Sequence, residues 1–131
     1  MPESLGALVF RPAAAMDLAR IVAMLADDPL GAKREKFADP LPAEYLEAFR
    51  AIAADSNNEL VVACKGDDVV GVLQLTFIPY LTHRGAWRAL IDGVRIAAPY
   101  RSSGFGTQMF EWAINRARER GCRLIQLTTD K

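Results

Sequence analysis

The chain has 131 residues, of which 51% are hydrophobic and 24% are charged; this composition supports one globular domain and excludes a disordered or fibrous protein. Its 16 basic and 16 acidic side chains cancel, so no overall positive charge favours binding to nucleic acid. No apolar run reaches the roughly 20 residues that span a bilayer, so we expect no membrane association.

Hydrophobic periodicity and chain breakers predict eight elements along the chain. The first strand ends at Pro12, which cannot donate to a strand ladder, and apolar residues at helical spacing follow it. Pro42 suits the first position of a second helix, beyond a polar stretch over 32–40. The predicted strands cover about 8–11, 60–64, 69–78, 89–97 and 123–128, and the predicted helices cover about 15–27, 42–54 and 104–120.

This order of elements predicts a single α/β domain over residues 1–131, with a mixed, mostly antiparallel sheet flanked by helices. The two middle strands are separated by a short polar turn over 65–68, which predicts an antiparallel hairpin. The last strand follows a helix, and a crossover of this kind makes the last two strands parallel.

The N-terminus and the cysteines indicate the compartment. Residues 1–10 carry Glu3 and no basic segment, so they do not form a secretory signal. Cys64 and Cys122 have no metal-ligand spacing, and we interpret them as reduced core residues rather than as a disulfide. With only one histidine and two distant cysteines, the sequence offers no zinc site. We therefore predict a cytoplasmic protein without a bound metal.

The charges are distributed unevenly along the chain. Residues 1–83 carry 7 Lys and Arg against 12 Asp and Glu, a net charge of −5, whereas residues 84–131 carry 9 against 4, a net charge of +5. A basic C-terminal half suits an anionic ligand, and a solvated arginine-rich helix face explains the same asymmetry. Charge alone therefore does not decide between them.

The most informative segment, over 91–107, runs from a strand through a glycine-bearing turn into a helix. Gly104 and Gly106 let the backbone approach a ligand closely, and the helix start offers unpaired N–H groups at the positive end of its dipole. Arg101 adds a fixed positive charge, and three nearby hydroxyls add donors, those of Ser102, Ser103 and Thr107. This combination predicts a phosphate-binding turn.

Two common phosphate-binding motifs do not fit this turn. A Walker loop needs a lysine between the last glycine and Thr107, and the sequence has none. The dinucleotide fingerprint needs a third glycine at the position of Met109. On the two glycines alone, a turn without any ligand remains an equal alternative.

The longer pattern Arg-x-x-Gly-x-Gly resembles the acetyl-CoA signature of the GCN5-related N-acetyltransferase (GNAT) superfamily. Pro99 and Tyr100 precede the arginine, and the strand before them reads Ile-Asp-Gly-Val-Arg-Ile. The predicted order of elements also matches that family from its first strand to its fifth. In that family the strand before the turn splays from its neighbour at a bulge, and the pantetheine arm of acetyl-CoA lies in the gap.

The resemblance implies which residues bind acetyl-CoA as co-substrate. The backbone of Val94, Arg95 and Ile96 would hold the pantetheine arm. The turn and the helix start would hold the pyrophosphate through Arg101, Ser102, Ser103, Gly104, Phe105, Gly106 and Thr107. Gly93 would mark the bulge, because a glycine inside a strand often does, with close packing against a neighbour as the alternative.

Asp92 is the candidate catalytic base. It stands where many members of the family carry a strand carboxylate beside the acetyl group, and an attacking amine must lose a proton. The alternative role of Asp92 is an ion pair with Arg84, Arg88 or Arg95. The resemblance further implies that a backbone N–H near residues 94–96 stabilises the developing oxyanion.

Two loops lie where the acceptor binds in the resembled family. One contains Lys33, Arg34, Glu35 and Lys36, and the other contains His83. Each is either a solvated loop or a substrate contact. If the first contacts substrate, its mixed charges favour a small polar amine over a basic peptide.

The sequence departs from the family at its end. Family members continue past the fifth strand with a helix and a hairpin, a region that often supplies a tyrosine as general acid, whereas this chain stops at Lys131. A strand ending at 128 would leave an open edge and an uncovered apolar face. We therefore expect a longer protein, or a partner chain that covers this edge.

The resemblance implies an N-acetyltransferase that moves an acetyl group from acetyl-CoA to an amine of a small molecule or peptide, by direct attack in a ternary complex. The alternative is a non-catalytic acyl-CoA-binding sensor or assembly module with the same fold. The resemblance also allows a homodimer, since dimers are common in that family.

Overall fold

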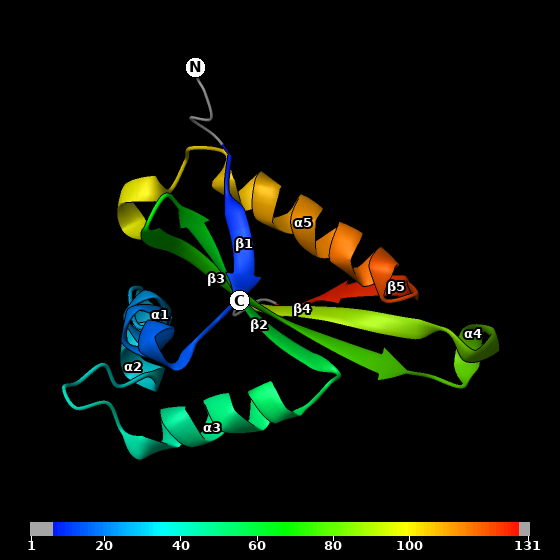
Figure 1. The fold of residues 1–131 in the computed structure, drawn as a ribbon, viewed down its shortest axis with the longest axis horizontal. Coiled ribbons are helices and arrows are strands. Elements are labelled where there is room, and N and C mark those ends of the chain that lie inside the picture. The colour runs from blue at the N-terminus through cyan, green and yellow to red at the C-terminus, as the bar shows by residue number, and fades with distance from the viewer. Residues whose placement is uncertain (1–6, 129–131) are drawn as a thin grey trace.

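A five-stranded sheet with the spatial order β1-β2-β3-β4-β5 forms the centre of the molecule (Figure 1). The computed structural model describes residues 7–128. The first four strands pair antiparallel, and β4 and β5 pair parallel across the α5 crossover. The strands are β1 Val9–Pro12, β2 Asn58–Lys65, β3 Asp68–Pro79, β4 Trp87–Ile96 and β5 Cys122–Leu127. The predicted mixed α/β fold is confirmed.

Helices cover both faces of this sheet. In Figure 1, α5 crosses one side of the sheet while α1, α2 and α3 lie on the other. The helices are α1 Leu18–Leu25, α2 Pro29–Arg34, α3 Ala43–Ala54, the single turn α4 Thr82–Gly85 and α5 Phe105–Glu119, and short 3₁₀ turns cover Ala15–Asp17 and Ala98–Tyr100. None of the residues of α3 is buried.

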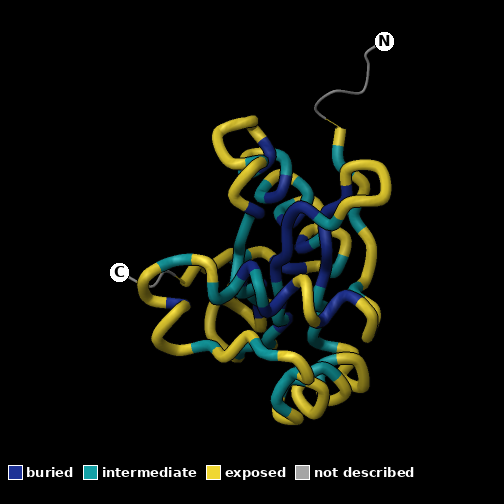
Figure 2. The backbone as a smooth tube through the Cα atoms, turned by 90° about the vertical axis from the view of Figure 1, so that its left-hand side faces the viewer, coloured by how far each residue is buried: buried dark blue, intermediate teal, exposed yellow. Residues whose placement is uncertain are grey.

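The core has two parts because successive strand residues face opposite sides of the sheet. On one face Leu73, Leu75 and Phe77 pack against α5, which contributes Met109 and Ala113. The other face carries a smaller cluster beneath α1, formed by Ile21, Met24, Val62, Cys64, Val72 and Ala97. Figure 2 shows the buried segments gathered at the centre of the chain. Cys64 and Cys122 are free and buried, as predicted.

The predicted helix over 15–27 is a 3₁₀ turn followed by α1, and a further short helix that was not predicted, α2, comes after it and extends into the predicted polar stretch. Asp28 caps α2 by accepting a hydrogen bond from the Gly31 N–H at 2.5 Å, and Pro29 occupies the first turn of α2. A Cβ on Gly31 would lie 1.9 Å from the Leu25 carbonyl oxygen, so only glycine permits this close approach to the end of α1. Asp28 and Pro29 are a recognisable helix start in the sequence. The helix after them was missed because its last residues are polar and were assigned to a loop.

Smaller differences concern element ends. Pro42 and Gly104 were each predicted inside a helix, and each is the residue before the first helical one. Pro12 is the last residue of β1, as predicted, and lies opposite Val61 at the edge of the sheet. The remaining strand ends shift by one or two residues, within the ordinary uncertainty of helix and strand boundaries.

Glu59 of β2 forms ion pairs with two arginines at the end of α5 and so links this helix to the sheet. Its carboxylate accepts hydrogen bonds from Arg116 Nε at 2.9 Å and from Arg120 Nη1 at 3.1 Å. These contacts lower the pKa of Glu59 below its ordinary value, with the hydrogen bond from Arg116 as the largest cause. The ionised form of Glu59 therefore stabilises the fold.

This ion pair predicts the acid sensitivity of the protein. Because the folded-state pKa of Glu59 is lowered, its contribution is present above the unfolded value of about 4.5 and is lost as the pH falls through the folded value. We expect Glu59→Gln to lower the free energy of unfolding at pH 7 and to reduce its decline below about pH 4.5. Urea unfolding between pH 3 and 7 measures both effects. Glu111→Gln, at an exposed position of α5, is the control and should behave like the wild type.

Candidate functional site

A bulge interrupts the pairing of β4 with β3. The register passes from Val72 opposite Arg95 to Gln74 opposite Asp92, so β4 carries one extra residue there. Gly93 lies in this interval with φ of +62°, a left-handed conformation that favours glycine. The predicted bulge at Gly93 is confirmed, and Gly93 has no close packing neighbour that would explain it otherwise.

Beyond the bulge, alternate amides of β4 point away from β3. The Ala97 N–H donates to the Val70 carbonyl at 2.8 Å, which directs residue 97, and by alternation residue 95, toward β3. Val94 and Ile96 therefore present their backbone groups on the opposite side. On that side the Val94 carbonyl accepts a hydrogen bond from Arg95 Nη1 at 2.9 Å, and the Ile96 carbonyl accepts one from Arg101 Nε at 3.0 Å.

Strand β5 does not follow β4 past the bulge within the part of the chain that the structure describes. Its pairing with β4 ends at Ile91 opposite Leu127, followed by one bond from the Thr128 N–H to the Ile91 carbonyl at 3.3 Å. Among residues 7–128, no strand pairs with the side of β4 to which Val94 and Ile96 present their backbone groups, and we call this side the gap. Such a gap can accept a ligand that forms hydrogen bonds with extended backbone.

The turn between β4 and α5 is built for close backbone approach. Ser102 and Gly104 both adopt positive φ, +66° and +85°, and α5 begins directly after Gly104. The first turn of α5 leaves the amides of Phe105, Gly106 and Thr107 without intrahelical partners. Amides of this kind, at the positive end of a helix dipole, are chemically suited to an anion.

Two side chains hold this turn in place. Arg101 Nε donates to the Ile96 carbonyl, and Arg101 Nη2 lies 3.5 Å from Asp27 Oδ2, so Arg101 ties the turn both to β4 and to the end of α1. The Ser103 hydroxyl donates to the Tyr100 carbonyl. Arg101 and Ser103 therefore orient the turn, and Arg101 also adds positive charge beside it.

The gap and the turn open into one cleft of about 1060 Å³. Six of the predicted site residues line it, namely Asp92, Val94, Arg95, Ile96, Arg101 and Gly106. Ser102, Ser103, Gly104 and Thr107 lie on the turn beside it without lining it, and Phe105 points its side chain into the core. Only the backbone of Phe105 is available to a ligand.

Asp92 is exposed at the bulge and lines the cleft. Its Oδ1 accepts hydrogen bonds from the Gly93 N–H at 2.7 Å and from the Thr128 hydroxyl at 2.5 Å. Within residues 7–128, Oδ2 accepts no hydrogen bond. Arg95, one of the candidate ion-pair partners, lies instead 3.4 Å from Asp28. The carboxylate is thus fixed through one oxygen and presents the other.

Several cleft residues were missed by sequence reasoning. Asp28 caps α2 and pairs with Arg95, and Gln74 lies directly opposite Asp92 on β3. Gln74 is one of two polar residues within the predicted strand over 69–78, the other being Thr76, and that signal could have identified it. Arg34 and Glu35, from the predicted acceptor-side loop, also line the cleft, whereas His83 lies in the distant β3–β4 turn and does not.

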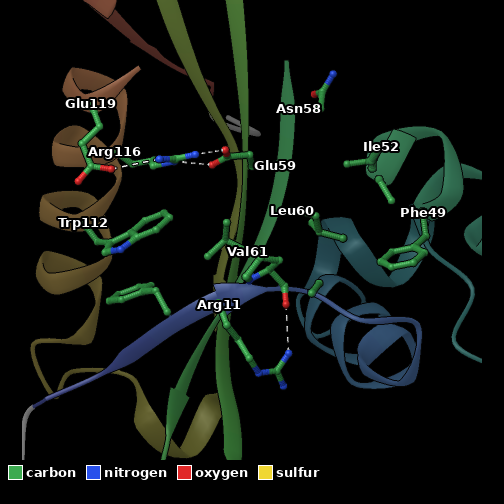
Figure 3. Close-up of a pocket in the computed structure, with 14 residues that line it drawn as sticks. Arg11, Phe49, Ile52, Asn58, Glu59, Leu60, Val61, Trp112, Arg116 and Glu119 are labelled. Atoms are coloured by element: carbon green, nitrogen blue, oxygen red, sulfur yellow. Dashed lines mark hydrogen bonds and ion pairs between the residues drawn. The ribbon is translucent and has the colours of Figure 1, made fainter. Parts of the chain in front are cut away.

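A second hollow of about 400 Å³ lies between β1, α3 and α5 (Figure 3). Its apolar lining includes Phe49, Leu60 and Trp112, and Figure 3 shows Arg116 pointing toward Glu59 across it. The polar groups at its rim are already paired with one another. It contains none of the predicted site residues, so the candidate site is the larger cleft.

Neither a metal site nor a membrane span is found in the described part of the chain. Across residues 7–128, no group of three or more metal-ligating side chains comes together. No helix in that range is long and apolar enough to cross a membrane.

A bulged strand and a glycine turn that leads into a helix therefore meet at one cleft. Residues 22–131 match the acetyltransferase (GNAT) family, and the chain belongs to that family. A structure described as a transcriptional regulator from Bacillus halodurans C-125 is 56% identical, with a TM-score of 0.91 over 95% of this chain and 83% of that one.

Two further similar proteins are more distant. A structure described as a predicted acetyltransferase with acetyl-CoA, from Clostridium acetobutylicum, has a TM-score of 0.72 at 20% identity, over 95% of this chain and 82% of that one, which shows the shared fold. Aminoalkylphosphonate N-acetyltransferase of Salmonella typhimurium is 28% identical over 86 residues, 66% of this chain. The chain spans about half the length of that curated relative, 55%.

The two glycines of the turn should respond differently to a methyl group. Gly104→Ala places a Cβ on left-handed backbone and should cost about 1 kcal/mol, or about 4 °C in melting temperature. Gly106→Ala brings its Cβ only to ordinary contact, 3.5 Å from Ile96 Cδ1, and should leave the melting temperature unchanged. Thermal unfolding of both variants checks this, and equal melting temperatures would contradict the described geometry of the turn.

Proposed function

We propose that this chain is an N-acetyltransferase that moves an acetyl group from acetyl-CoA to an amine by direct attack in a ternary complex. One observation carries the proposal: the backbone gap at Val94 and Ile96, the anion-binding turn before α5 and the carboxylate of Asp92 all open into the same cleft. Membership of the acetyltransferase (GNAT) family supports it. The free thiols of Cys64 and Cys122 support a cytoplasmic location.

Acetyl-CoA would be held by backbone more than by side chains. The amides of residues 105–107 and the charge of Arg101 suit its pyrophosphate, and the backbone groups of Val94 and Ile96 suit the amides of its pantetheine arm. The arm would then place the thioester near the bulge, where Asp92 stands. Bound acetyl-CoA supplies an activated acetyl group, and the described residues orient it.

Asp92 would act as the general base. The attacking amine passes a proton to Asp92 Oδ2, directly or through one water, and its lone pair forms the new bond to the acetyl carbon. The bond between that carbon and sulfur breaks, and the departing CoA sulfur takes a proton from solvent. A backbone N–H of Val94 or Ile96 would donate to the acetyl oxygen as negative charge develops on it.

The acceptor is an amine of a small molecule or peptide. The Salmonella typhimurium relative is named for an aminoalkylphosphonate acceptor, which supports small amines as a class. The cleft has a volume of about 1060 Å³. Because this volume must hold acetyl-CoA as well as the acceptor, a small acceptor suits it.

A non-catalytic acyl-CoA-binding module is the second candidate. The Bacillus halodurans structure, 56% identical, carries the description of a transcriptional regulator, and a regulator can use the same cleft to sense an acyl-CoA. Acetyl transfer by the purified protein separates the two candidates, since only the enzyme turns over.

Binding of acetyl-CoA is tested by thermal unfolding. At about 100 times its Kd, the ligand should add about 2.7 kcal/mol to stability, a shift of several degrees. Gly104→Asp places a carboxylate at the turn and should abolish the shift. Gly66→Asp is the matched control, because Gly66 also has positive φ, +61°, but lies in the β2–β3 turn. A full shift in Gly104→Asp would remove the turn from the site.

The role of Asp92 is tested by Asp92→Asn, which keeps its size and removes the proton acceptor. We expect kcat to fall by at least about 100-fold while the acetyl-CoA thermal shift is retained. Asp67→Asn, in the exposed β2–β3 turn, is the control. Unchanged turnover in Asp92→Asn would exclude Asp92 as base. Acetyl-CoA binding without turnover of any amine by the wild type would favour the sensor.

A further inference from the structure

Tyr100 stands directly before the turn that leads into α5, and it does not line the cleft. Its ring is half-buried and packs against the core cluster beneath α1. The same ring stacks on Phe105, the first residue of α5, with the two centroids 6.1 Å apart and the planes inclined by 25°. Any effect of Tyr100 on a ligand must therefore pass through the turn.

The backbone of Tyr100 contacts the turn as well. Its carbonyl accepts a hydrogen bond from the Ser103 hydroxyl, in the middle of the turn. The residue before Ser103 is Ser102, which has φ of +66°, a conformation that residues with a side chain rarely adopt. A turn of this kind persists only where surrounding contacts stabilise it, and Tyr100 supplies one contact to Ser103 and another to α5.

The phenol of Tyr100 is held by a residue far away in the sequence. Its hydroxyl donates to Oδ2 of Asp68, the first residue of β3, at 3.1 Å. This hydrogen bond is the main cause that raises the pKa of Tyr100, so the phenol remains a donor at neutral pH. The start of β3 is itself fixed, because Arg20 Nε of α1 donates to the Val69 carbonyl at 3.0 Å.

We propose that Tyr100 is a positioning residue for the turn before α5: Asp68 fixes its phenol, and its ring and carbonyl fix the turn. The conformation that presents the amides of residues 105–107 thereby depends on a hydrogen bond outside the cleft. This role rests on the proposed function, in which those amides bind the pyrophosphate of acetyl-CoA. A turn that is ordered before binding loses less conformational entropy in the complex, so the ligand binds more tightly.

The test compares a ligand that contains the pyrophosphate with one that lacks it. CoA carries the pyrophosphate, whereas pantetheine consists of the arm alone. The Kd of CoA is measured by isothermal titration calorimetry and that of pantetheine by NMR titration, so neither result depends on turnover. The variants are Tyr100→Phe, Asp68→Ala, Asp68→Asn and the double substitution of Tyr100→Phe with Asp68→Ala.

Tyr100→Phe removes only the hydroxyl and should raise the Kd of CoA about 3- to 10-fold, the range for one hydrogen bond. Asp68→Ala should raise it by the same factor, and the double variant should equal either single one, because both remove one shared bond. Asp68→Asn keeps an acceptor oxygen and should restore most of the affinity. The Kd of pantetheine should not change in any of these variants.

Charge alone predicts the opposite result for Asp68. Removal of a carboxylate near a site for an anion weakens repulsion and would lower the Kd of CoA. Asp67→Ala is the matched control, because its exposed neighbour position in the β2–β3 turn loses the same charge without the bond to Tyr100. Tyr80→Phe, outside the cleft, is the control for the loss of a phenol hydroxyl. Neither control should raise the Kd of CoA.

Three results would overturn this role. They are an unchanged Kd of CoA in Tyr100→Phe, a lower Kd of CoA in Asp68→Ala that matches Asp67→Ala, and an equal rise for pantetheine, which would indicate damage to the whole cleft. In each case the wild type still binds CoA and the proposed function stands. If the wild type binds no CoA, the proposed function and the role of Tyr100 are both wrong.

Discussion

The extra residue in β4 is the constraint on which the site depends. A regular strand would continue its ladder on both sides, and its N–H and C=O groups would be satisfied within the sheet. Gly93 adopts left-handed backbone at the register shift between β3 and β4, and within residues 7–128 the pairing of β5 with β4 ends at Ile91, before the bulge. The backbone of Val94 and Ile96 that faces away from β3, the exposed Asp92 and the turn before α5 all lie beside this one change in register.

The fold class was predictable from the sequence because its signals are local. Strands with long apolar runs, such as 69–78, and the stripe of α5 that includes Met109 and Ala113 are set by side-chain periodicity within one element. The end of the first helix near residue 27 was predicted, but the short helix α2 after it was not, because its packing depends on a close contact: Gly31 approaches the Leu25 carbonyl, which no periodicity reports. At this point a tertiary contact, rather than the intrinsic helix propensity of the residues, determines the local structure.

The candidate site divides in the same way. The turn before α5 and the bulge lie within residues 92–107 and could be predicted, since glycine positions and helix starts are written in consecutive residues. Gln74 and Asp28 could not be placed, because they reach the cleft from β3 and from the start of α2. Their positions depend on register across the sheet and on the packing of α2, which are properties of the whole fold. Phe105 differs in the opposite way: it belongs to the predicted site motif, but its side chain is buried in the core.

The thin packing of α3 has a consequence for the order in which the molecule opens. None of its residues is buried, so its separation from the sheet exposes little apolar area, and its local unfolding free energy lies well below that of the strands. The same helix carries Tyr45, whose bond to Glu35 is one of its attachments to the rest of the fold. Local unfolding of α3 and the shape of the cleft are therefore linked equilibria. A change that loosens the hydrogen bond between Tyr45 and Glu35 therefore speeds amide hydrogen exchange along the whole of α3.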